Sequence, residues 1–330
     1  MPDGKEYYVG VDLGGTKILA AVFSPGLKCL GKSKRNTKAE RGTQAVIDRI
    51  ARCVEDAVDE CDLDIKLCRG VGVGAPGAVD FEAGKVIFAP NLDWKDVPLK
   101  KDLEKRLNVP VFLDNDCNVC TLGVFEKELE GKPASMVGMF IGTGIGGGIV
   151  LDGKPYSGMS HTAGEVGHMV IQVDGPKCGC GRKGCLEALA SKTAMFKQLQ
   201  SAVKNGEKTE LLNIVGEELS EIKSSHLRKA LKRGDKLVKK TLDEAARCIG
   251  IGAANLVNVF NPEYVVFGGG VINALEDEMF DTIVSAAKEY VFPGAERGLK
   301  FVASKLGDDA GITGAAVLAR RYARQNPPAS

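Results

Sequence analysis

The stretch AGEVGHMVIQVDGPKCGCGRKGCLE, residues 163–187, brings three thiols, an imidazole and the carboxylates of Glu165 and Glu187 into one short window. Three thiols and an imidazole form the Cys3His ligand set of a closed, tetrahedral structural zinc site. Glycines between the cysteines allow the tight turns that let the sulfurs converge. The alternatives are ordinary buried thiols and a disulfide framework, although cysteines two residues apart are poorly placed to pair. We expect structural Zn2+ on four ligands: His168, Cys178, Cys180 and Cys185.

Composition narrows the possible classes of protein around this stretch. A chain of 330 residues suits two domains of ordinary size. Lys and Arg total 44 against 43 for Asp and Glu, so there is no basic field for nucleic acid or anionic lipid. No run reaches the ~18 apolar residues of a membrane span, and the first residues do not resemble a signal peptide. We therefore expect a cytoplasmic protein whose ten cysteines stay reduced.

Two glycine turns, each between short apolar strands, suggest phosphate binding. DLGGTK, residues 12–17, lies between one such pair, and GTGIGGG, residues 142–148, lies between another. Glycine leaves backbone N–H groups open to a phosphate. Each turn alone could be a plain hairpin, but the pair predicts two related half-folds that hold one nucleotide.

Two glycine patterns imitate the dinucleotide fingerprint G-x-G-x-x-G. One comprises Gly72, Gly74 and Gly77, and the other lies in the turn after residue 141. The fingerprint requires a helix directly after the turn, whereas both patterns run into hairpins. A nucleotide-dependent dehydrogenase is therefore disfavoured.

The segment DNDCN follows an apolar strand and opens a helix, which places Asn115 and Asp116 at a strand end. Open α/β sheets bind ligands at such ends. An ionised carboxylate there suits proton acceptance from a substrate hydroxyl during phosphoryl transfer. The competing role for Asp116 is that of a helix N-cap. On the same helix, Cys117 and Cys120 form a C-x-x-C pair, for which two buried thiols are a simpler account than redox control.

GEVGH followed by CGCGRKGCLE, together with DLGGTK and NDCN, resembles the ROK family of repressors, open reading frames and sugar kinases. The likeness runs from Val9 to Gly314 and is greatest to bacterial-type ATP-dependent glucokinases. It implies an α/β fold with two ribonuclease-H-like (actin-like ATPase) domains and a cleft between them. The small N-terminal domain would comprise residues 1–119 and a C-terminal helix at about 311–330. The large domain would comprise residues 120–310 and carry the zinc site.

The resemblance also assigns roles to residues. Asp116 would be the catalytic base. The hexose would be bound by Gly74, Ala75, Asn91, Asn115, Asp116, Glu165, His168 and Glu187. ATP and Mg2+ would be held by Asp12, Gly14, Gly15, Thr16, Lys17, Thr143, Gly144, Gly269 and Gly270. From local sequence alone, Asn91 is equally well a turn residue, and Gly269 and Gly270 a strand-to-helix turn.

The implied activity is ATP-dependent phosphorylation of the hexose 6-hydroxyl. D-glucose is the expected acceptor because TAGEVGH resembles the glucokinase form of this motif and lacks the HPE of fructokinases. The alternatives are fructose, N-acetylmannosamine or N-acetylglucosamine as acceptor, and a sugar-responsive regulator. Repressors of the family carry an N-terminal helix-turn-helix, whereas the first ATPase-like strand here begins at about Tyr7. Family members are usually dimers or tetramers, so we expect a homo-oligomer. Residues 191–240 predict charged helices that cover the large domain.

Overall fold

The computed structural model describes residues 6–216, Leu219 and residues 222–325 of the chain. Its contacts divide into two compact units. Unit 1 comprises residues 1–133, 148–164 and 308–330, and unit 2 comprises residues 134–147 and 165–307. The sequence predicts these divisions at other places, between residues 119 and 120 and between residues 310 and 311. The last residues of the expected C-terminal helix, 326–330, lie outside the described part of the chain.

Unit 1 is built on a five-stranded sheet in the order β3-β2-β1-β4-β8. Strands β1 (Tyr7–Leu13), β2 (Lys17–Phe23) and β3 (Cys29–Asn36) are antiparallel neighbours. Strands β4 (Cys68–Ala75) and β8 (Val111–Asn115) extend the sheet in parallel with β1. The carboxyl ends of β1, β4 and β8 therefore meet at one edge.

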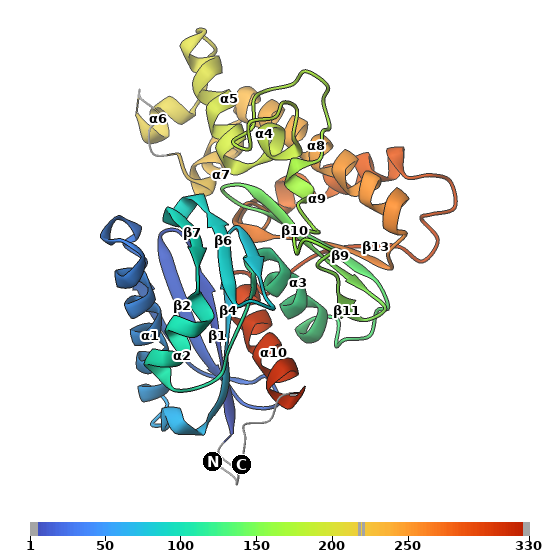
Figure 1. Ribbon diagram of the computed structural model, residues 1–330. Coiled ribbons are helices and arrows are strands. Elements are labelled where there is room, and N and C mark those ends of the chain that lie inside the picture. The colour runs from blue at the N-terminus through green and yellow to red at the C-terminus, as the bar shows by residue number, and fades with distance from the viewer. Residues whose placement is uncertain (1–5, 217–218, 220–221, 326–330) are drawn as a thin grey trace. The chain divides into compact units, whose positions relative to one another are not determined.

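Helices cover both faces of this sheet (Figure 1). On one face, Val9 and Val11 share a buried cluster with the apolar sides of α1 (Thr43–Asp59) and α2 (Leu99–Leu107). On the other face, Gly10 lets α10 (Asp309–Gln325) approach, because a Cβ at Gly10 would lie 1.8 Å from the Ile312 carbonyl oxygen. Helix α3 (Asp116–Lys127) packs beside α10, where Gly314 meets the backbone of Val119.

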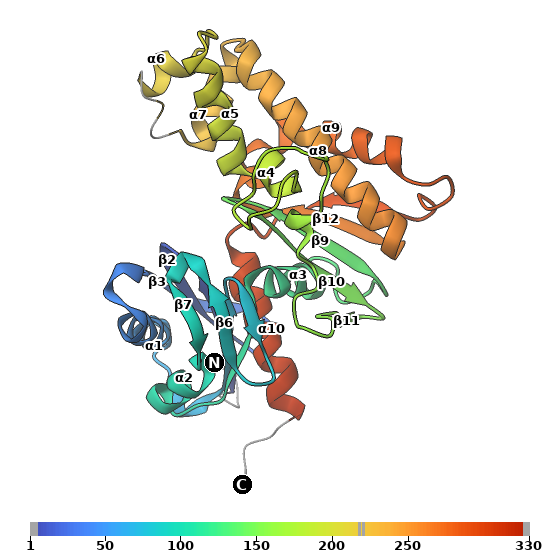
Figure 2. The same cartoon turned by 45° about the horizontal axis from the view of Figure 1, so that its top comes forward.

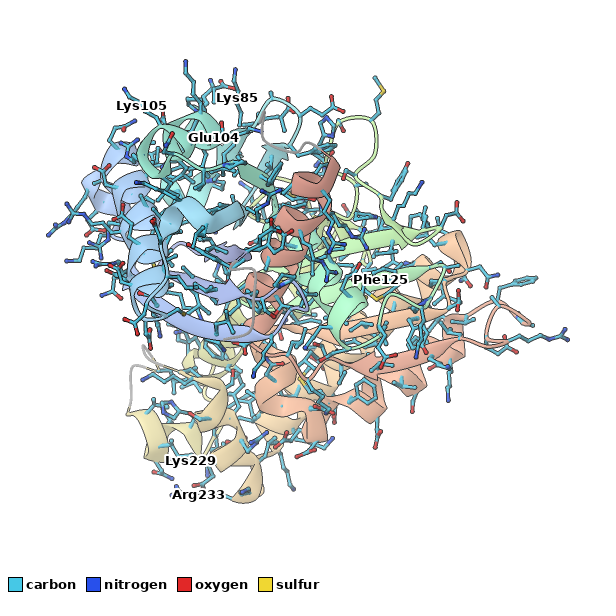
Figure 3. The ribbon with its side chains drawn as sticks, turned by 90° about the horizontal axis from the view of Figure 1, so that it is seen from below. Lys85, Glu104, Lys105, Phe125, Lys229 and Arg233 are labelled. Atoms are coloured by element: carbon cyan, nitrogen blue, oxygen red, sulfur yellow. The ribbon has the colours of Figure 1, made fainter. Side chains whose placement is uncertain are left out.

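A small antiparallel sheet follows β4 in unit 1. It contains β5 (Ala78–Asp80), β6 (Lys85–Ala89) and β7 (Trp94–Val97). Figure 3 shows the expected division of side chains, with Lys85 and Lys105 pointing outward and Phe125 inside. Trp94 is the one tryptophan in the chain and is only 1% exposed, so it can report on the core of unit 1.

Unit 2 contains most of a second sheet, in the order β11-β10-β9-β12-β13. Its strands are β9 (Met136–Ile141), β10 (Ile145–Leu151), β11 (Lys154–Pro155), β12 (Tyr264–Gly268) and β13 (Lys300–Ala303). Strand β12 is parallel to both β9 and β13. The boundary between the two units passes through β10, between Gly147 and Gly148.

The helices of unit 2 pack together on its sheet (Figure 2). They are α4 (Leu186–Ala190), α5 (Lys192–Lys204), α6 (Leu211–Val215), α7 (Ser224–Lys232), α8 (Lys236–Phe260) and α9 (Gly269–Tyr290). The described part of residues 191–240 is largely helical, as expected. Gly269 and Gly270 are the first residues of α9 and directly follow β12, so they form the strand-to-helix turn that local sequence allows. Among the described residues, none of the helices combines the length and apolar character that crossing a bilayer requires.

Candidate functional site

The predicted acceptor-side residues of unit 1 gather at the carboxyl edge of β1, β4 and β8. Asp12 pairs with Gly74 across β1 and β4, and Ala75 pairs with Asn115 across β4 and β8. Gly74 has a packing reason as well, since a Cβ there would lie 2.4 Å from Val119 Cγ2 on α3. The absence of a side chain lets the start of α3 lie against the strand end.

Asp116 lies close enough to Asp12 to affect the ionisation of the Asp12 carboxyl. Burial, reinforced by the Asp116 carboxylate, raises the pKa of Asp12 to about 7, while Lys17 acts in the opposite direction. Lys17 is itself ion-paired with Asp308, just before α10. At this edge, Asp12, Asp116 and Asp308 supply carboxylates and Lys17 an ammonium group, an arrangement suited to a cation and a phosphate.

The helix cap at this edge is made by Asn115, so capping does not account for Asp116. The Asn115 side chain accepts hydrogen bonds from the backbone N–H groups of Cys117 and Asn118, at 2.8 and 3.3 Å. Its amide nitrogen donates to the Gly77 carbonyl at 2.9 Å, which fixes the side chain across to the start of β5. Asp116 is the first residue of α3 and also accepts from the Cys117 N–H at 2.8 Å. The positive end of the helix dipole favours an ionised carboxylate there.

The first glycine turn has the hairpin geometry that its sequence predicts. Gly14 donates its N–H to the Lys17 carbonyl at 2.9 Å, and the Thr16 side chain is exposed. Asn91 lies beside this turn in a short 3-10 segment, with its Cβ 3.3 Å from where a Cβ on Gly15 would stand. Asn91 is exposed and lines a cavity of about 310 Å³ with Thr43 and Glu40. The structure therefore brings the predicted sugar residue Asn91 against the predicted phosphate turn.

The predicted nucleotide residues of unit 2 also gather at one sheet edge. Thr143 and Gly144 follow β9, and Gly269 and Gly270 follow its parallel neighbour β12. Gly269 has φ of 87°, and a Cβ there would lie 2.6 Å from the Ile141 carbonyl oxygen, so only glycine fits without strain. The N-terminus of the long helix α9 opens at this point, which is favourable for an anion.

The four predicted zinc ligands converge in unit 2. Their donor atoms all lie within 4.8 Å of one another. Cys180 Sγ lies 3.7 Å from Cys185 Sγ, and Cys178 Sγ lies 3.7 Å from His168 Nδ1. Bond lengths of about 2.3 Å to sulfur and about 2.0 Å to nitrogen would separate tetrahedral ligands by about 3.6–3.8 Å. The residues present therefore fit a zinc ion.

Two of the glycines in this loop carry its turns. Gly181 and Gly184 have φ of 88° and 75°. A Cβ at Gly184 would lie 1.7 Å from the Gln172 carbonyl oxygen, so the loop closes only with glycine there. Gly179 has open space around it and no positive φ, so the loop does not need a glycine at this position, contrary to expectation.

The polar residues around the zinc ligands are linked to the glycine turn of unit 2. His168 faces the thiols through Nδ1, while its Nε2 lies 3.8 Å from Glu165 Oε2. Glu187, in the first turn of α4, has Oε1 3.7 Å from Cys178 Sγ and accepts the Ile145 N–H through Oε2 at 3.0 Å. A Cβ at Gly144 would lie 2.3 Å from the same Oε2. Glu187 thus joins the metal cluster to the predicted phosphate turn.

The C-x-x-C pair on α3 does not have the environment of a redox site. Burial, with the charges of Asp12, Asp116 and Asp308, raises the pKa of the Cys120 thiol well above its ordinary value. Reactive cysteines instead have lowered pKa values in electropositive surroundings. Cys120, which is partly buried, therefore lacks the surroundings of a reactive cysteine.

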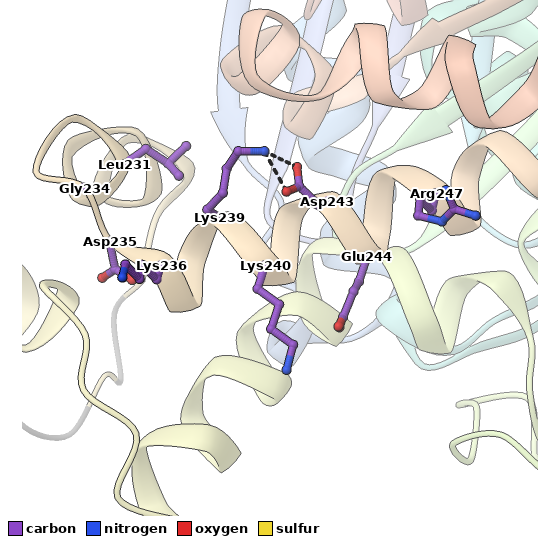
Figure 4. A pocket seen from close by; sticks show the side chains of 9 residues that line it. All are labelled: Leu231, Gly234, Asp235, Lys236, Lys239, Lys240, Asp243, Glu244 and Arg247. Carbon is purple, nitrogen blue, oxygen red and sulfur yellow. Dashed lines mark hydrogen bonds and ion pairs between the residues drawn. The ribbon is translucent and has the colours of Figure 1, made fainter.

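A further cavity, lined by none of the predicted site residues, lies over the end of α7 and the start of α8 in unit 2. It encloses about 510 Å³ beside Leu231, Lys236, Lys240 and Glu244. Figure 4 shows Lys239 paired with Asp243 along its rim. Its lining contains both acidic and basic side chains, and Asp235 is occupied as the N-cap of α8.

Sequence reasoning missed three residues at the edge of unit 1. Asp308 holds Lys17, and Asp114 binds the Asn118 side chain at 2.9 Å. His161, in the segment that follows β11, lies close enough to Asp114 to affect its pKa. Asp114 lies within DNDCN and could have been proposed from its position, but the other two reach the edge from distant parts of the chain.

Known proteins resemble this chain over nearly its whole length. A glucokinase of Thermotoga maritima is 36% identical over 93% of this chain and 95% of its own. The crystal structure of a ROK family glucokinase from Streptomyces griseus, in complex with glucose and AMPPNP, is 33% identical with a TM-score of 0.83. The match covers 96% of this chain and 99% of that one. A xylose repressor of Caldicellulosiruptor bescii is 33% identical over 93% of this chain and 76% of its own.

The family model described as "ROK family" matches residues 8–322. That range includes both sheet edges and the four clustered metal ligands. The α/β fold with two actin-like units is the one predicted from the motifs. The chain belongs to the ROK family.

Proposed function

We propose that this protein transfers the γ-phosphoryl group of ATP to the 6-hydroxyl of a hexose, with D-glucose as preferred acceptor. The observation that carries the proposal is the edge of unit 1, where Asp116 opens α3 beside Asn115 and Asp12. A carboxylate placed there is suited to take the proton of an attacking hydroxyl. The S. griseus relative, crystallised with glucose and AMPPNP, supports the same pair of substrates.

The residues divide the work by chemistry. Asp116 accepts the hydroxyl proton, and Asn115, fixed by the Gly77 carbonyl, orients the sugar. The backbone of Gly14 to Thr16, with Lys17, holds phosphate oxygens at one edge. Thr143, Gly144, Gly269 and Gly270 hold the nucleotide at the other. The proposal requires both units to act on one pair of substrates, with water excluded so that ATP is not hydrolysed.

Mg2+, when bound, neutralises the charge of the phosphates, and Asp12 is the carboxylate placed to help hold it. Burial leaves Asp12 with a pKa of about 7, so a cation would also favour its ionised form. A zinc ion held by His168, Cys178, Cys180 and Cys185 would fix the positions of the neighbouring Glu165 and Glu187, and with four protein ligands it would leave no position for substrate. With Nδ1 on the metal, His168 would keep its Nε2–H free for a sugar hydroxyl, beside Glu165.

Three further properties belong to the proposal. We propose that the two units correspond to a small and a large domain. We propose a cytoplasmic location, since a cluster of three free thiols requires a reducing compartment. We also propose a homodimer or homotetramer, which light scattering after gel filtration would test.

The test is a panel of acceptors with purified protein and Mg-ATP. We expect D-glucose to give the highest kcat/KM, above fructose, N-acetylmannosamine and N-acetylglucosamine, because unpaired polar groups in the pocket penalise the others. A higher kcat/KM for one of these three sugars would change the substrate assignment, but the assignment as a sugar kinase would stand.

The second candidate function is a regulator, which the repressor relative makes worth testing. Sugar binding without turnover of any acceptor would favour that reading over the kinase.

A further inference from the structure

Helix α9 of unit 2 is kinked, because one residue near its start departs from helical geometry. Leu275 has φ of −132° and ψ of 25°. Residues of a regular α-helix have φ of about −63° and ψ of about −42°. Proline, glycine and serine, which cause many kinks, do not occur in the sequence ALEDE at this point. A side chain that inserts into the hydrogen-bond ladder of a helix is another recognised cause of a kink.

The side chain that reaches this kink is Arg228 of α7. Its guanidinium donates one hydrogen bond to the carbonyl oxygen of Ala274, the residue directly before Leu275. Its Nε donates a second hydrogen bond, to Glu278 Oε1 at 2.9 Å, one turn further along α9. In a regular helix the carbonyl of residue 274 would accept from the N–H of residue 278. Arg228 therefore holds α9 on both sides of the irregular residue.

The position of Arg228 is itself fixed, because α7 packs on the core of unit 2. Its neighbours on α7, Leu227 and Ala230, are buried in that core. The planar guanidinium presents several donors at fixed angles, which suits two acceptors on one helix better than an ammonium group would. The side chains of Arg228 and Glu278 are 39% and 21% exposed, and ion pairs this accessible add little stability. The contact therefore matters more for the direction of α9 than for the stability of unit 2.

The part of α9 before the kink carries the two glycines predicted to hold the nucleotide. Gly269 and Gly270 open the helix directly after β12, and Ala274 lies about one turn later. The start of this turn is fixed against the Ile141 backbone, since a Cβ at Gly269 would lie 2.6 Å from the Ile141 carbonyl oxygen. The end of the same turn is the carbonyl that Arg228 binds. The direction of the turn thus depends on a side chain from another helix.

We propose that Arg228 is a positioning residue for nucleotide binding, which holds the first turn of α9 in the direction that the bound nucleotide requires. The proposal rests on the proposed function for the ligand, ATP, and for the role of Gly269 and Gly270. Arg228 acts through the Ala274 carbonyl and not by contact with the nucleotide. One of the charged helices within residues 191–240, for which the sequence predicts only a covering role, thereby takes part in binding.

The experiment measures the binding of AMPPNP, with Mg2+, and of D-glucose separately by calorimetry, and thermal unfolding checks that each variant is folded. Arg228→Met removes both hydrogen bonds and keeps a long side chain. Arg228→Lys keeps the charge but not the fork of donors. Arg247→Met is the matched control, because Arg247 of α8 pairs with Glu289 at 3.5 Å, in the last turn of α9 and beyond the kink.

We expect Arg228→Met to raise the dissociation constant for AMPPNP by about 3- to 30-fold, as for a residue that acts through a neighbouring element. Its dissociation constant for D-glucose should stay within about twofold of wild type, because the sugar is bound by other elements. Arg228→Lys should recover part of the lost nucleotide affinity. Arg247→Met should match wild type with both ligands.

Unchanged AMPPNP binding by Arg228→Met would overturn the proposal. An equal loss of AMPPNP and glucose affinity, or equal losses in the Arg228→Met and Arg247→Met variants, would also overturn it, because either result indicates a general loosening of unit 2. If Arg228→Met does not fold, Arg228→Lys decides between these results.

The same measurements separate this proposal from the proposed function. Wild-type protein that binds AMPPNP and glucose without phosphorylating any hexose would refute the proposed function, and the role of Arg228 would still be decided by the binding data. Wild-type protein that binds no nucleotide would refute both.

Discussion

The carboxylate of Asp12 should make the stability of unit 1 depend on pH, and Asp12→Asn should remove that dependence. In the unfolded chain an aspartate loses its proton near its ordinary pKa of 3.8, whereas in the fold the pKa of Asp12 is raised to about 7. Asp12 therefore destabilises the fold at any pH at which it is ionised in the unfolded chain, because its ionisation is unfavourable in the folded protein. The penalty is absent below about pH 4, grows as the pH rises, and is complete above about pH 7.

The size of the effect follows from the same pKa values. Each pKa unit corresponds to about 1.4 kcal/mol, and the interval from pH 5 to the folded pKa spans about two units. Asp12 is partly exposed, so solvent screening reduces the resulting figure. We expect Asp12→Asn to gain on the order of 1–2 kcal/mol more stability relative to wild type at pH 8 than at pH 5.

The assay is urea unfolding at both pH values, monitored by the fluorescence of Trp94. The protein is used without added Mg2+ and without nucleotide. Trp94 is the one tryptophan and is buried in unit 1, so its signal reports on the unit that contains Asp12. Asp96→Asn, at an exposed position with φ of 51° that asparagine accepts, controls for the loss of one carboxylate. An equal gain at the two pH values, or a loss of stability at pH 8, would refute the argument from burial.

Three further outcomes are expected. The Cys180→Ser variant should lose zinc by elemental analysis and show a glucose KM raised about tenfold or more, with the ATP KM nearly unchanged; zinc-free protein with wild-type KM values would contradict this. Gly144→Ala should raise the KM for both substrates, because the added Cβ would lie 2.3 Å from Glu187 Oε2. Gly142→Ala should leave both KM values unchanged, because no atom lies closer than 4.0 Å to its added Cβ. Equal kinetics of the two variants would contradict this expectation. Cys120 should resist alkylation at pH 8 in the native protein, by peptide mapping, and rapid labelling there would show that its raised pKa is wrong.

The sequence was sufficient for the parts of the site that depend on local spacing. Cys178, Cys180 and Cys185 converge because few residues separate them, and glycine turns require no distant partner. Asn115 and Asp116 could be placed at the end of a strand because an apolar run leads directly into them. The repeated strand–turn–strand pattern predicted two related half-folds, and the resemblance to the ROK family implied the actin-like α/β fold.

Other features depend on tertiary packing that no local pattern encodes. Gly72 belongs to a false dinucleotide fingerprint, and its actual requirement is the approach of α10, where its Cβ would lie 1.8 Å from the Ala315 carbonyl oxygen. Unit 1 is assembled from three separate segments, so Asp308 meets Lys17 across 291 positions of sequence. His161 is a single residue in a loop without a motif, and its approach to Asp114 can be recognised only in the folded chain.

The central claim is that Asp116 is the base of a hexose kinase, and single-turnover phosphorylation of D-glucose by Asp116→Asn tests it most directly. The substitution is nearly isosteric and leaves the Asn115 cap in place. We predict that the rate of phosphoryl transfer falls by roughly 10²–10⁴-fold while the dissociation constant for ATP stays within about twofold of wild type. A variant that retains more than about a tenth of the wild-type rate would show that Asp116 positions the sugar and is not the base.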